Sequence, residues 1–154
     1  MDYWKKLRQC FGVERFIVTA TAGAIVEGEK ILLVKNRSLG KWQIPGGLQE
    51  VGESLQQTIQ REIKEELGLD LIADRLIGVY SGTDWNIDYP DGGKLQQVLH
   101  FFLMKGEPGI MRIQKSEIED AKFFPIGEPP EDIMPCCKQK IADLRAFSGK
   151  VFVR

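Results

Sequence analysis

The sequence lacks the apolar segments that would place it across a membrane. Among its 154 residues, no apolar run approaches the length of about 18 residues that a membrane-spanning helix needs. The N-terminal letters MDYWKKLRQCFG carry charges where a signal peptide has its apolar core. We therefore expect a cytoplasmic protein with no membrane partner.

The sequence also has few cysteines and almost no net charge. Cys10, Cys136 and Cys137 are odd in number and two are adjacent, so they predict reduced thiols rather than a disulfide framework or a zinc site. The 21 basic and 22 acidic residues leave a net charge of −1, and no basic field indicates binding to long nucleic acid. The expected partners are small molecules.

The chain has enough apolar residues for one domain. With 43% apolar content, residues 1–154 are enough to form the core of one domain and too few to form the cores of two. The patterns of apolar residues and turn residues predict several elements along the chain. They are an amphipathic helix over residues 2–11, a hairpin of Phe16–Val26 with Ile31–Lys35, strands at Leu71–Tyr80, Leu95–Met104 and Ile110–Ile113 (weak), and a last helix that ends by Gly149.

The stretch GGLQEVGESLQQTIQREIKEELGL, residues 46–69, predicts a helix that carries carboxylates. Ser54 and Gln57 form a capping-box pair, and Gly68 is a left-handed stop, so the helix should run from about Leu55 to Leu67. Pro45 and the two glycines after it form a turn with little side-chain bulk, which lets the backbone approach a ligand or ion closely.

Three acids of this helix share one sector. Glu62, Glu65 and Glu66 lie beside an apolar stripe, and like charges at this spacing cost about 0.2–0.5 kcal/mol per pair. A divalent metal would remove that cost. For Glu65 or Glu66 taken singly, an ordinary solvated helix face is the favoured interpretation.

The whole pattern resembles the signature of the Nudix hydrolases. That signature is Gly, five residues, Glu, seven residues, then Arg, Glu, an aliphatic residue, any residue, Glu, Glu, any residue, Gly and an aliphatic residue. The sequence matches it without departure at Gly47, Glu53, Arg61, Glu62, Ile63, Glu65, Glu66, Gly68 and Leu69. At average residue frequencies, a chance match at a given start is below about one in ten million.

The resemblance implies both a fold and a reaction. The fold would be α/β, a Nudix-type α/β/α sandwich with a mixed β-sheet between helices. The reaction would be hydrolysis of a pyrophosphate bond in a nucleoside diphosphate linked to another moiety, through a metal-activated water. The expected cofactor is Mg²⁺, with Mn²⁺ as a substitute, and the expected substrate is a nucleotide or nucleotide conjugate.

The resemblance also implies site residues. The metal ligands would be Glu62, Glu65, Glu66 and the backbone carbonyl of Gly46. The segment Glu117–Ile126 resembles the Nudix segment in which an acid precedes an aromatic strand; Glu117 best fits that acid, and Glu119 and Asp120 are alternatives. The general base would be Glu62 or an acid near it such as Glu117. Arg61 and Glu53 would pair to hold the loop against the helix, and Glu53 is a further candidate for contact with a metal or its water.

Substrate contacts are expected from the loops around this signature. The resemblance places Arg37 and Lys41 beside the pyrophosphate, where they would meet phosphate oxygens, although for each residue alone an ordinary surface cation is the favoured interpretation. Trp42 and Trp85 are candidates to stack on a base, and the alternative for Trp42 is packing in the core. His100, the only histidine, is expected to have a structural role.

Two questions remain open from the sequence. The N-terminal helix and the apolar tail Val151–Val153 would serve either a homodimer or closure of the domain. A Nudix fold can also be a catalytically silent nucleotide-binding or regulatory module. Such a module would lose signature acids, and here none is lost, so the sequence favours the hydrolase.

Overall fold

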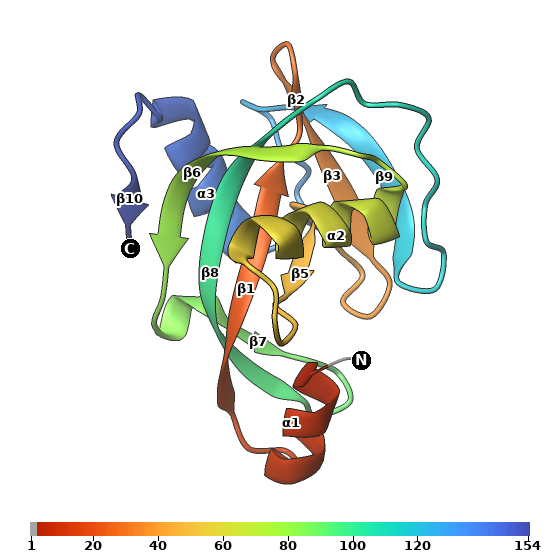
Figure 1. Cartoon of the computed structure of the whole chain (residues 1–154), viewed down its shortest axis with the longest axis vertical. Coiled ribbons are helices and arrows are strands. Elements are labelled where there is room, and N and C mark those ends of the chain that lie inside the picture. Colours follow the sequence, from red (N-terminus) through yellow and green to blue (C-terminus); the bar gives the residue numbers. More distant parts are fainter. Residues whose placement is uncertain (1–2) are drawn as a thin grey trace.

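The computed structural model describes residues 3–154, and its elements surround a β-layer with a helix on either side (Figure 1). The predicted N-terminal helix is present as α1 (Tyr3–Phe11); its expected first residue, position 2, lies outside the described residues. No residue of α1 is buried. Within the described chain, no helix is both long and apolar enough to cross a membrane.

The β-layer consists of two sheets, and the larger one contains both parallel and antiparallel strand pairs, which confirms the expected mixed sheet. The six-stranded sheet contains β1 (Phe16–Ala24), β5 (Gly46–Leu48), β6 (Ile72–Tyr80), β7 (Asn86–Asp88), β8 (Lys94–Lys105) and β10 (Phe152–Val153). Its order is β10-β6-β8-β1-β5, with β7 also paired to β8. The four-stranded sheet contains β2 (Val26–Glu27), β3 (Lys30–Asn36), β4 (Lys41–Gln43) and β9 (Ile118–Pro125).

The predicted long hairpin between Phe16–Val26 and Ile31–Lys35 is wrong. Only its tip forms, because β2 pairs with β3 around the turn at Gly28, whose φ is +60°. The strand β1 instead pairs in parallel with β8 and antiparallel with β5. Since both edges of β1 are occupied, no edge remains for β3, which pairs with β4 and β9 in the other sheet.

The predicted weak strand at Ile110–Ile113 is also wrong. This segment has no strand structure and runs instead past the end of helix α2 (Leu55–Leu67). The backbone N–H of Arg112 donates to the Leu67 carbonyl at 2.8 Å, and that of Gln114 donates to the Glu66 carbonyl at 2.9 Å. The segment therefore satisfies carbonyls that the helix end would leave without partners.

The two main helices cover opposite sides of the β-layer, which confirms the predicted α/β/α arrangement (Figure 1). Helix α2 buries Ile59, Ile63 and Leu67 in one core cluster, and helix α3 (Pro135–Ala146) buries Cys137 and Ile141 in another. The predicted strand Leu95–Met104 is confirmed as the long β8, which lies inside the larger sheet.

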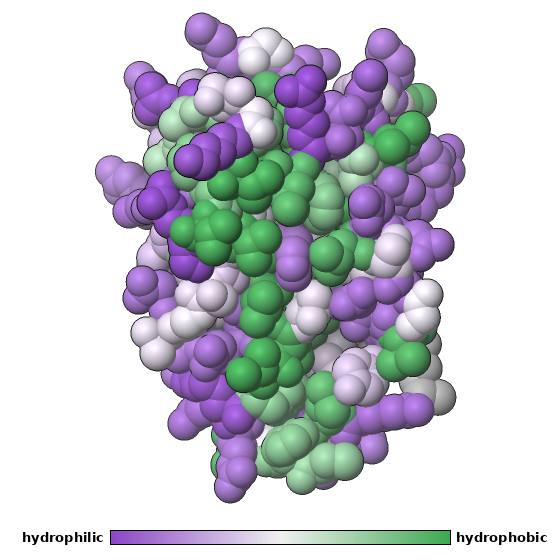
Figure 2. Space-filling model, turned by 60° about the vertical axis from the view of Figure 1, so that its left-hand side comes forward, coloured by the Kyte–Doolittle hydropathy of each residue, from purple (hydrophilic) through white to green (hydrophobic). Residues whose placement is uncertain are grey.

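A band of apolar side chains crosses the face of the molecule shown in Figure 2. Large hydrophobic side chains that remain exposed include Val13, Ile17 and Val153, of which Val153 is 81% exposed. The tail segment Phe152–Val153 pairs in parallel with β6, so it extends the larger sheet. The homodimer stays a prediction.

Candidate active site

Both predicted ends of α2 are confirmed. The Ser54 hydroxyl accepts a hydrogen bond from the Gln57 backbone N–H at 3.2 Å, and the Gln57 side chain accepts one from the Ser54 N–H at 2.8 Å. At the other end, Gly68 has a φ of +71° and donates its N–H to the Lys64 carbonyl. These caps fix where the helix begins, and hence which residues face the sheet.

The strand β5 brings two glycines under the acidic sector of α2. Gly46 and Gly47 pair with Ala22 and Thr21 of β1. A side chain on Gly46 would overlap the Thr21 carbonyl oxygen, and one on Gly47 would overlap the Glu62 carboxyl group. Only glycine therefore lets β5 lie this close to β1 at Gly46 and to α2 at Gly47.

Of the acids of α2, Glu66 is buried and Glu62 is half-buried against this strand. Glu66 is 4% exposed, and its Oε2 accepts a hydrogen bond from the Gly46 N–H at 3.3 Å. Burial raises the pKa of Glu66 well above its ordinary value, and the Glu62 charge adds to this effect. Burial also raises the pKa of Glu62 to about 7, although Arg61 opposes the shift.

The Arg61 guanidinium contacts three carboxylates at once. It binds Glu53 through two parallel hydrogen bonds, Nε to Oε1 at 2.6 Å and Nη2 to Oε2 at 3.0 Å. Its Nη1 donates to Glu62 Oε1 at 2.8 Å and to Glu65 Oε2 at 3.2 Å. The hydrogen bond from Arg61 lowers the pKa of Glu53 to about 2, so this carboxylate stays ionised.

The sequence did not reveal two further contacts that hold this arrangement. The buried Thr58 hydroxyl donates to Glu53 Oε2 at 2.9 Å, and the Leu48 carbonyl accepts from Arg61 Nη2 at 3.1 Å. Thr58 occupies a signature position that tolerates any residue, and a backbone carbonyl has no sequence signal. Both contacts depend on how the loop folds back onto the helix.

Glu117 lies in the segment before β9. Its side chain is exposed, and its charge contributes to the raised pKa values of Glu62 and Glu66. The structure therefore brings Glu117 within electrostatic range of the α2 acids. The alternative Asp120 instead pairs with Lys122 at 3.7 Å and accepts a hydrogen bond from the Ala121 N–H. Glu119 is exposed.

The two expected phosphate ligands lie on exposed segments. Arg37 donates its Nε hydrogen to the Lys115 carbonyl at 2.9 Å and its backbone N–H to the Glu117 carbonyl at 2.9 Å. Arg37 is therefore hydrogen-bonded to the loop that carries Glu117. Lys41 is exposed at the start of β4, opposite Asn36 of β3.

The two expected stacking residues lie in the core. Trp42 is 5% exposed and packs edge-on against Phe124, with ring centroids 4.8 Å apart. Trp85 is also 5% exposed, and its ring centroid lies 4.5 Å from that of Tyr80. Both tryptophans therefore fit the packing interpretation better than a contact with substrate.

The chemistry of the site matches a hard divalent cation. Within residues 3–154, no group of three or more His, Cys, Asp or Glu side chains is arranged to hold a metal ion by itself. Mg²⁺ commonly uses one or two carboxylates and takes its remaining ligands from water and phosphate. Glu62 and Glu66 provide such a pair, and their raised pKa values mean that added positive charge would stabilise their ionised forms.

Comparison with known proteins identifies a family and several relatives of this chain. The family model described as the NUDIX domain matches residues 18–143. A Bacillus subtilis protein named as a candidate 8-oxo-dGTP diphosphatase is 31% identical over 129 residues, covering 81% of this chain and 80% of its own length. An ADP-ribose pyrophosphatase of Methanocaldococcus jannaschii is 33% identical over 115 residues, covering 73% of this chain and 64% of its own.

A solved structure has the same fold. The crystal structure of an ADP-ribose pyrophosphatase from Streptococcus suis superimposes with a TM-score of 0.67 at 25% identity. The match covers 89% of this chain and 98% of that one. The similarity therefore extends over most of both chains.

Proposed function

The chain belongs to the NUDIX family, and from this premise we propose that it hydrolyses the pyrophosphate bond of a nucleoside diphosphate derivative. One observation carries the proposal. Glu62 and Glu66 are held against the Gly46–Gly47 strand in a setting that raises the pKa of each, although the neighbouring Arg61 is cationic. Carboxylates that are costly to ionise gain most from a bound cation.

The metal site is proposed from the oxygen atoms that α2 and β5 present. Glu62, Glu66 and the Gly46 carbonyl would hold Mg²⁺, or Mn²⁺ in its place, with Glu65 as a more exposed ligand. Bound there, the ion would neutralise pyrophosphate charge and lower the pKa of a water. Substrate oxygens would complete the coordination, as is usual for Mg²⁺.

The remaining roles fall to residues around the helix. Either Glu62 or Glu117 would accept the proton of the attacking water, since both are acids in this cluster. Glu53 and Arg61 keep the loop docked on α2 and hold the Glu62 carboxylate in place through Arg61 Nη1. Arg37 and Lys41, which are both exposed, would bind phosphate oxygens.

The substrate class follows from what the relatives have in common. One is named for 8-oxo-dGTP and another for ADP-ribose. Both compounds are nucleosides joined through a pyrophosphate to a further group. We therefore propose a nucleotide or nucleotide conjugate as substrate, and the catalytically silent module remains the second candidate.

A substrate panel with and without chelator tests the proposal. Nucleoside triphosphates, ADP-ribose, nucleotide sugars and dinucleotides would be assayed with Mg²⁺. We expect chelator-sensitive cleavage of at least one class and a loss of at least about 100-fold in kcat for Glu66→Gln. The matched control is Glu128→Gln, which alters an exposed glutamate in the turn after β9. Folded protein that binds a nucleotide tightly but cleaves none of the panel would favour the silent module.

A further inference from the structure

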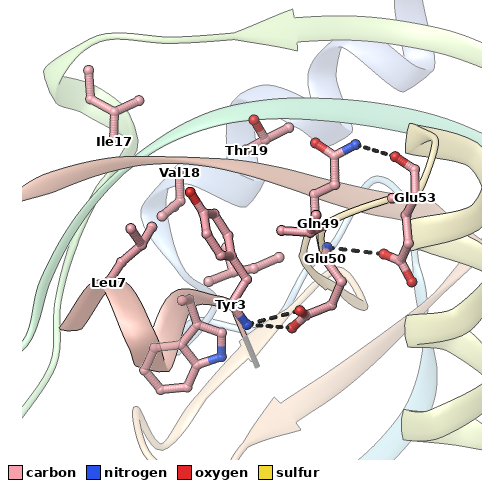
Figure 3. Close-up of a pocket in the computed structure, with 12 residues that line it drawn as sticks. Tyr3, Leu7, Ile17, Val18, Thr19, Gln49, Glu50 and Glu53 are labelled. Atoms are coloured by element: carbon pink, nitrogen blue, oxygen red, sulfur yellow. Dashed lines mark hydrogen bonds between the residues drawn. The ribbon is translucent and has the colours of Figure 1, made fainter. Parts of the chain in front are cut away.

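A pocket of about 390 Å³ lies between α1 and the loop that carries Glu53 (Figure 3). Helix α1 contributes Tyr3, Trp4 and Leu7 to its wall, and β1 contributes residues 17–19. The other side is residues 48–53, the segment that connects β5 to α2. The pocket therefore borders the segment that positions the proposed catalytic acids.

The lining has the chemistry of a site for a flat, uncharged ring. Two of its twelve residues, Tyr3 and Trp4, are aromatic, and most others are apolar or carry neutral polar groups. None of the twelve is lysine or arginine, whereas two, Glu50 and Glu53, are acids. The Lys5 ammonium lies 5.6 Å from the centroid of the Trp4 ring without lining the pocket. Such a lining repels phosphate and favours an aromatic group with N–H donors.

The pocket and the acid cluster border neighbouring positions of β1. Along β1, Thr19 of the pocket wall is two residues from Thr21, which pairs with Gly47 beneath the Glu62 carboxylate. At the usual rise of a strand, this separation is about 7 Å. An extended nucleotide can span it, with its base in the pocket and its phosphates at α2.

A chain of hydrogen bonds connects the pocket to Arg61. The Tyr3 backbone N–H donates to both Glu50 carboxylate oxygens, at 2.9 and 3.0 Å. The Glu50 N–H donates to Glu53 Oε2 at 3.1 Å, and Glu53 in turn binds Arg61. Figure 3 shows Tyr3 reaching from α1 toward β1 while its backbone contacts Glu50. A ligand held between α1 and this loop would therefore hold the Glu53 segment in place.

From these observations we propose that this pocket binds the nucleobase of the substrate, with Trp4 and Tyr3 as the aromatic contacts. The inference rests on the proposed function, because it assigns the base to one end of the same substrate. Since the family match begins at residue 18, the α1 wall lies outside it. Base selectivity would then come from a part of the chain that the family model does not cover.

Fluorescence tests the pocket without any turnover. Trp42 and Trp85 are buried, so a change in tryptophan emission on adding a nucleoside without phosphate reports mainly on Trp4. We expect adenosine or guanosine to quench this emission in the wild type, and the quenching to disappear in Trp4→Phe. Wild-type protein that shows no quenching by any nucleoside would overturn the inference.

Kinetics provide the second readout. Trp4→Ala should raise KM for a nucleotide substrate about tenfold with little change in kcat, and Trp4→Phe should restore most of the loss. Hydrolysis of tripolyphosphate, which has no base, should not change. Lys6→Ala, an exposed change on α1 outside the pocket lining, is the matched control.

A second variant tests the pocket without changing α1, because Trp4→Ala could raise KM by unfolding that helix. Ile17→Trp places a bulky ring on the exposed strand wall of the pocket and leaves the α1 side chains intact, so it should also raise KM. An unchanged KM in both Trp4→Ala and Ile17→Trp would overturn the pocket assignment and leave the hydrolase proposal standing. Quenching of Trp4 in a protein that cleaves no nucleotide would support the pocket and count against the hydrolase.

Discussion

The Glu62 carboxylate lies so close to Gly47 that no side chain fits between them. A Cβ built on Gly47 would lie 2.5 Å from Glu62 Oε2, a separation that real Cβ atoms do not show. The glycine and the acid are fifteen positions apart in the sequence, and the loop that returns into α2 brings them together.

Replacing Gly47 with alanine should displace the Glu62 carboxylate. We expect kcat to fall by about 100-fold or more, because a small shift of a catalytic group has a large effect on rate. Thermal unfolding would show a folded protein, destabilised by about 1–3 kcal/mol from overpacking. Gly127→Ala is the control, since a Cβ there has no neighbour within 4 Å. Wild-type turnover in Gly47→Ala would contradict the proposed role of Glu62.

The ion pair of Glu53 with Arg61 should make stability depend on pH. In the folded protein the pKa of Glu53 is about 2, below the ordinary value of 4.5. The contribution of the ion pair to the unfolding free energy is therefore complete above about pH 4.5 and is lost as the pH falls toward 2. We expect Glu53→Gln to lower the unfolding free energy at pH 7 by about 1–3 kcal/mol. The difference from wild type should disappear near pH 2. A difference that does not change between pH 6 and pH 2 would contradict this assignment.

Mg²⁺ binding should release protons. Because the pKa of Glu62 is raised to about 7, and that of Glu66 is raised as well, part of the site is protonated just below neutral pH. Metal ions bind the ionised carboxylates, so at pH 6.5 we expect release of about one proton per Mg²⁺ and tighter binding as the pH rises. Calorimetry in buffers with different ionisation enthalpies measures the release. The number of protons released per Mg²⁺ should decrease in Glu62→Gln. A binding enthalpy that is the same in every buffer would argue against this metal site.

A hydrogen-bonded network around the buried Asp143 of α3 should contribute to stability and not to catalysis. The Tyr80 hydroxyl donates to Asp143 Oδ2 at 2.9 Å, and Arg154 Nη2 donates to Asp143 Oδ1 at 2.6 Å. Burial alone would raise the pKa of Asp143, but these hydrogen bonds outweigh it and the pKa is lowered. Tyr80→Phe should cost about 1–2 kcal/mol in unfolding free energy and leave kcat unchanged. A large fall in kcat at unchanged stability would instead connect this network to the site.

Local chemistry explains why α2 was predictable. Its ends depend on residues within a few positions of one another, Ser54 with Gln57 and Gly68 with the preceding turn. The spacing of Glu62, Glu65 and Glu66 places them in one sector of any helix, whatever surrounds it. The strands at Ile72–Tyr80 and Lys94–Lys105 were also visible from their apolar runs.

Strand pairing was not predictable to the same degree. The run from Phe16 to Val26 looked like half of a hairpin because the next apolar segment follows a turn, but β1 lies between β8 and β5. Nothing local encodes that choice, because the partner β8 is about eighty positions away and apolar strands of this kind can pair with many others.

The sequence by itself determined the family, because the signature from Gly47 to Leu69 specifies residue types whose spacing on a helix is fixed by local geometry. Only the tertiary structure decided the environment of each group. It buried Glu66, placed Trp42 and Trp85 in the core, and brought α1 against the loop that carries Glu53. Burial and long-range contacts depend on how segments distant in the sequence pack together. Burial sets the pKa values of Glu62 and Glu66, and the contact of α1 with the loop forms the pocket.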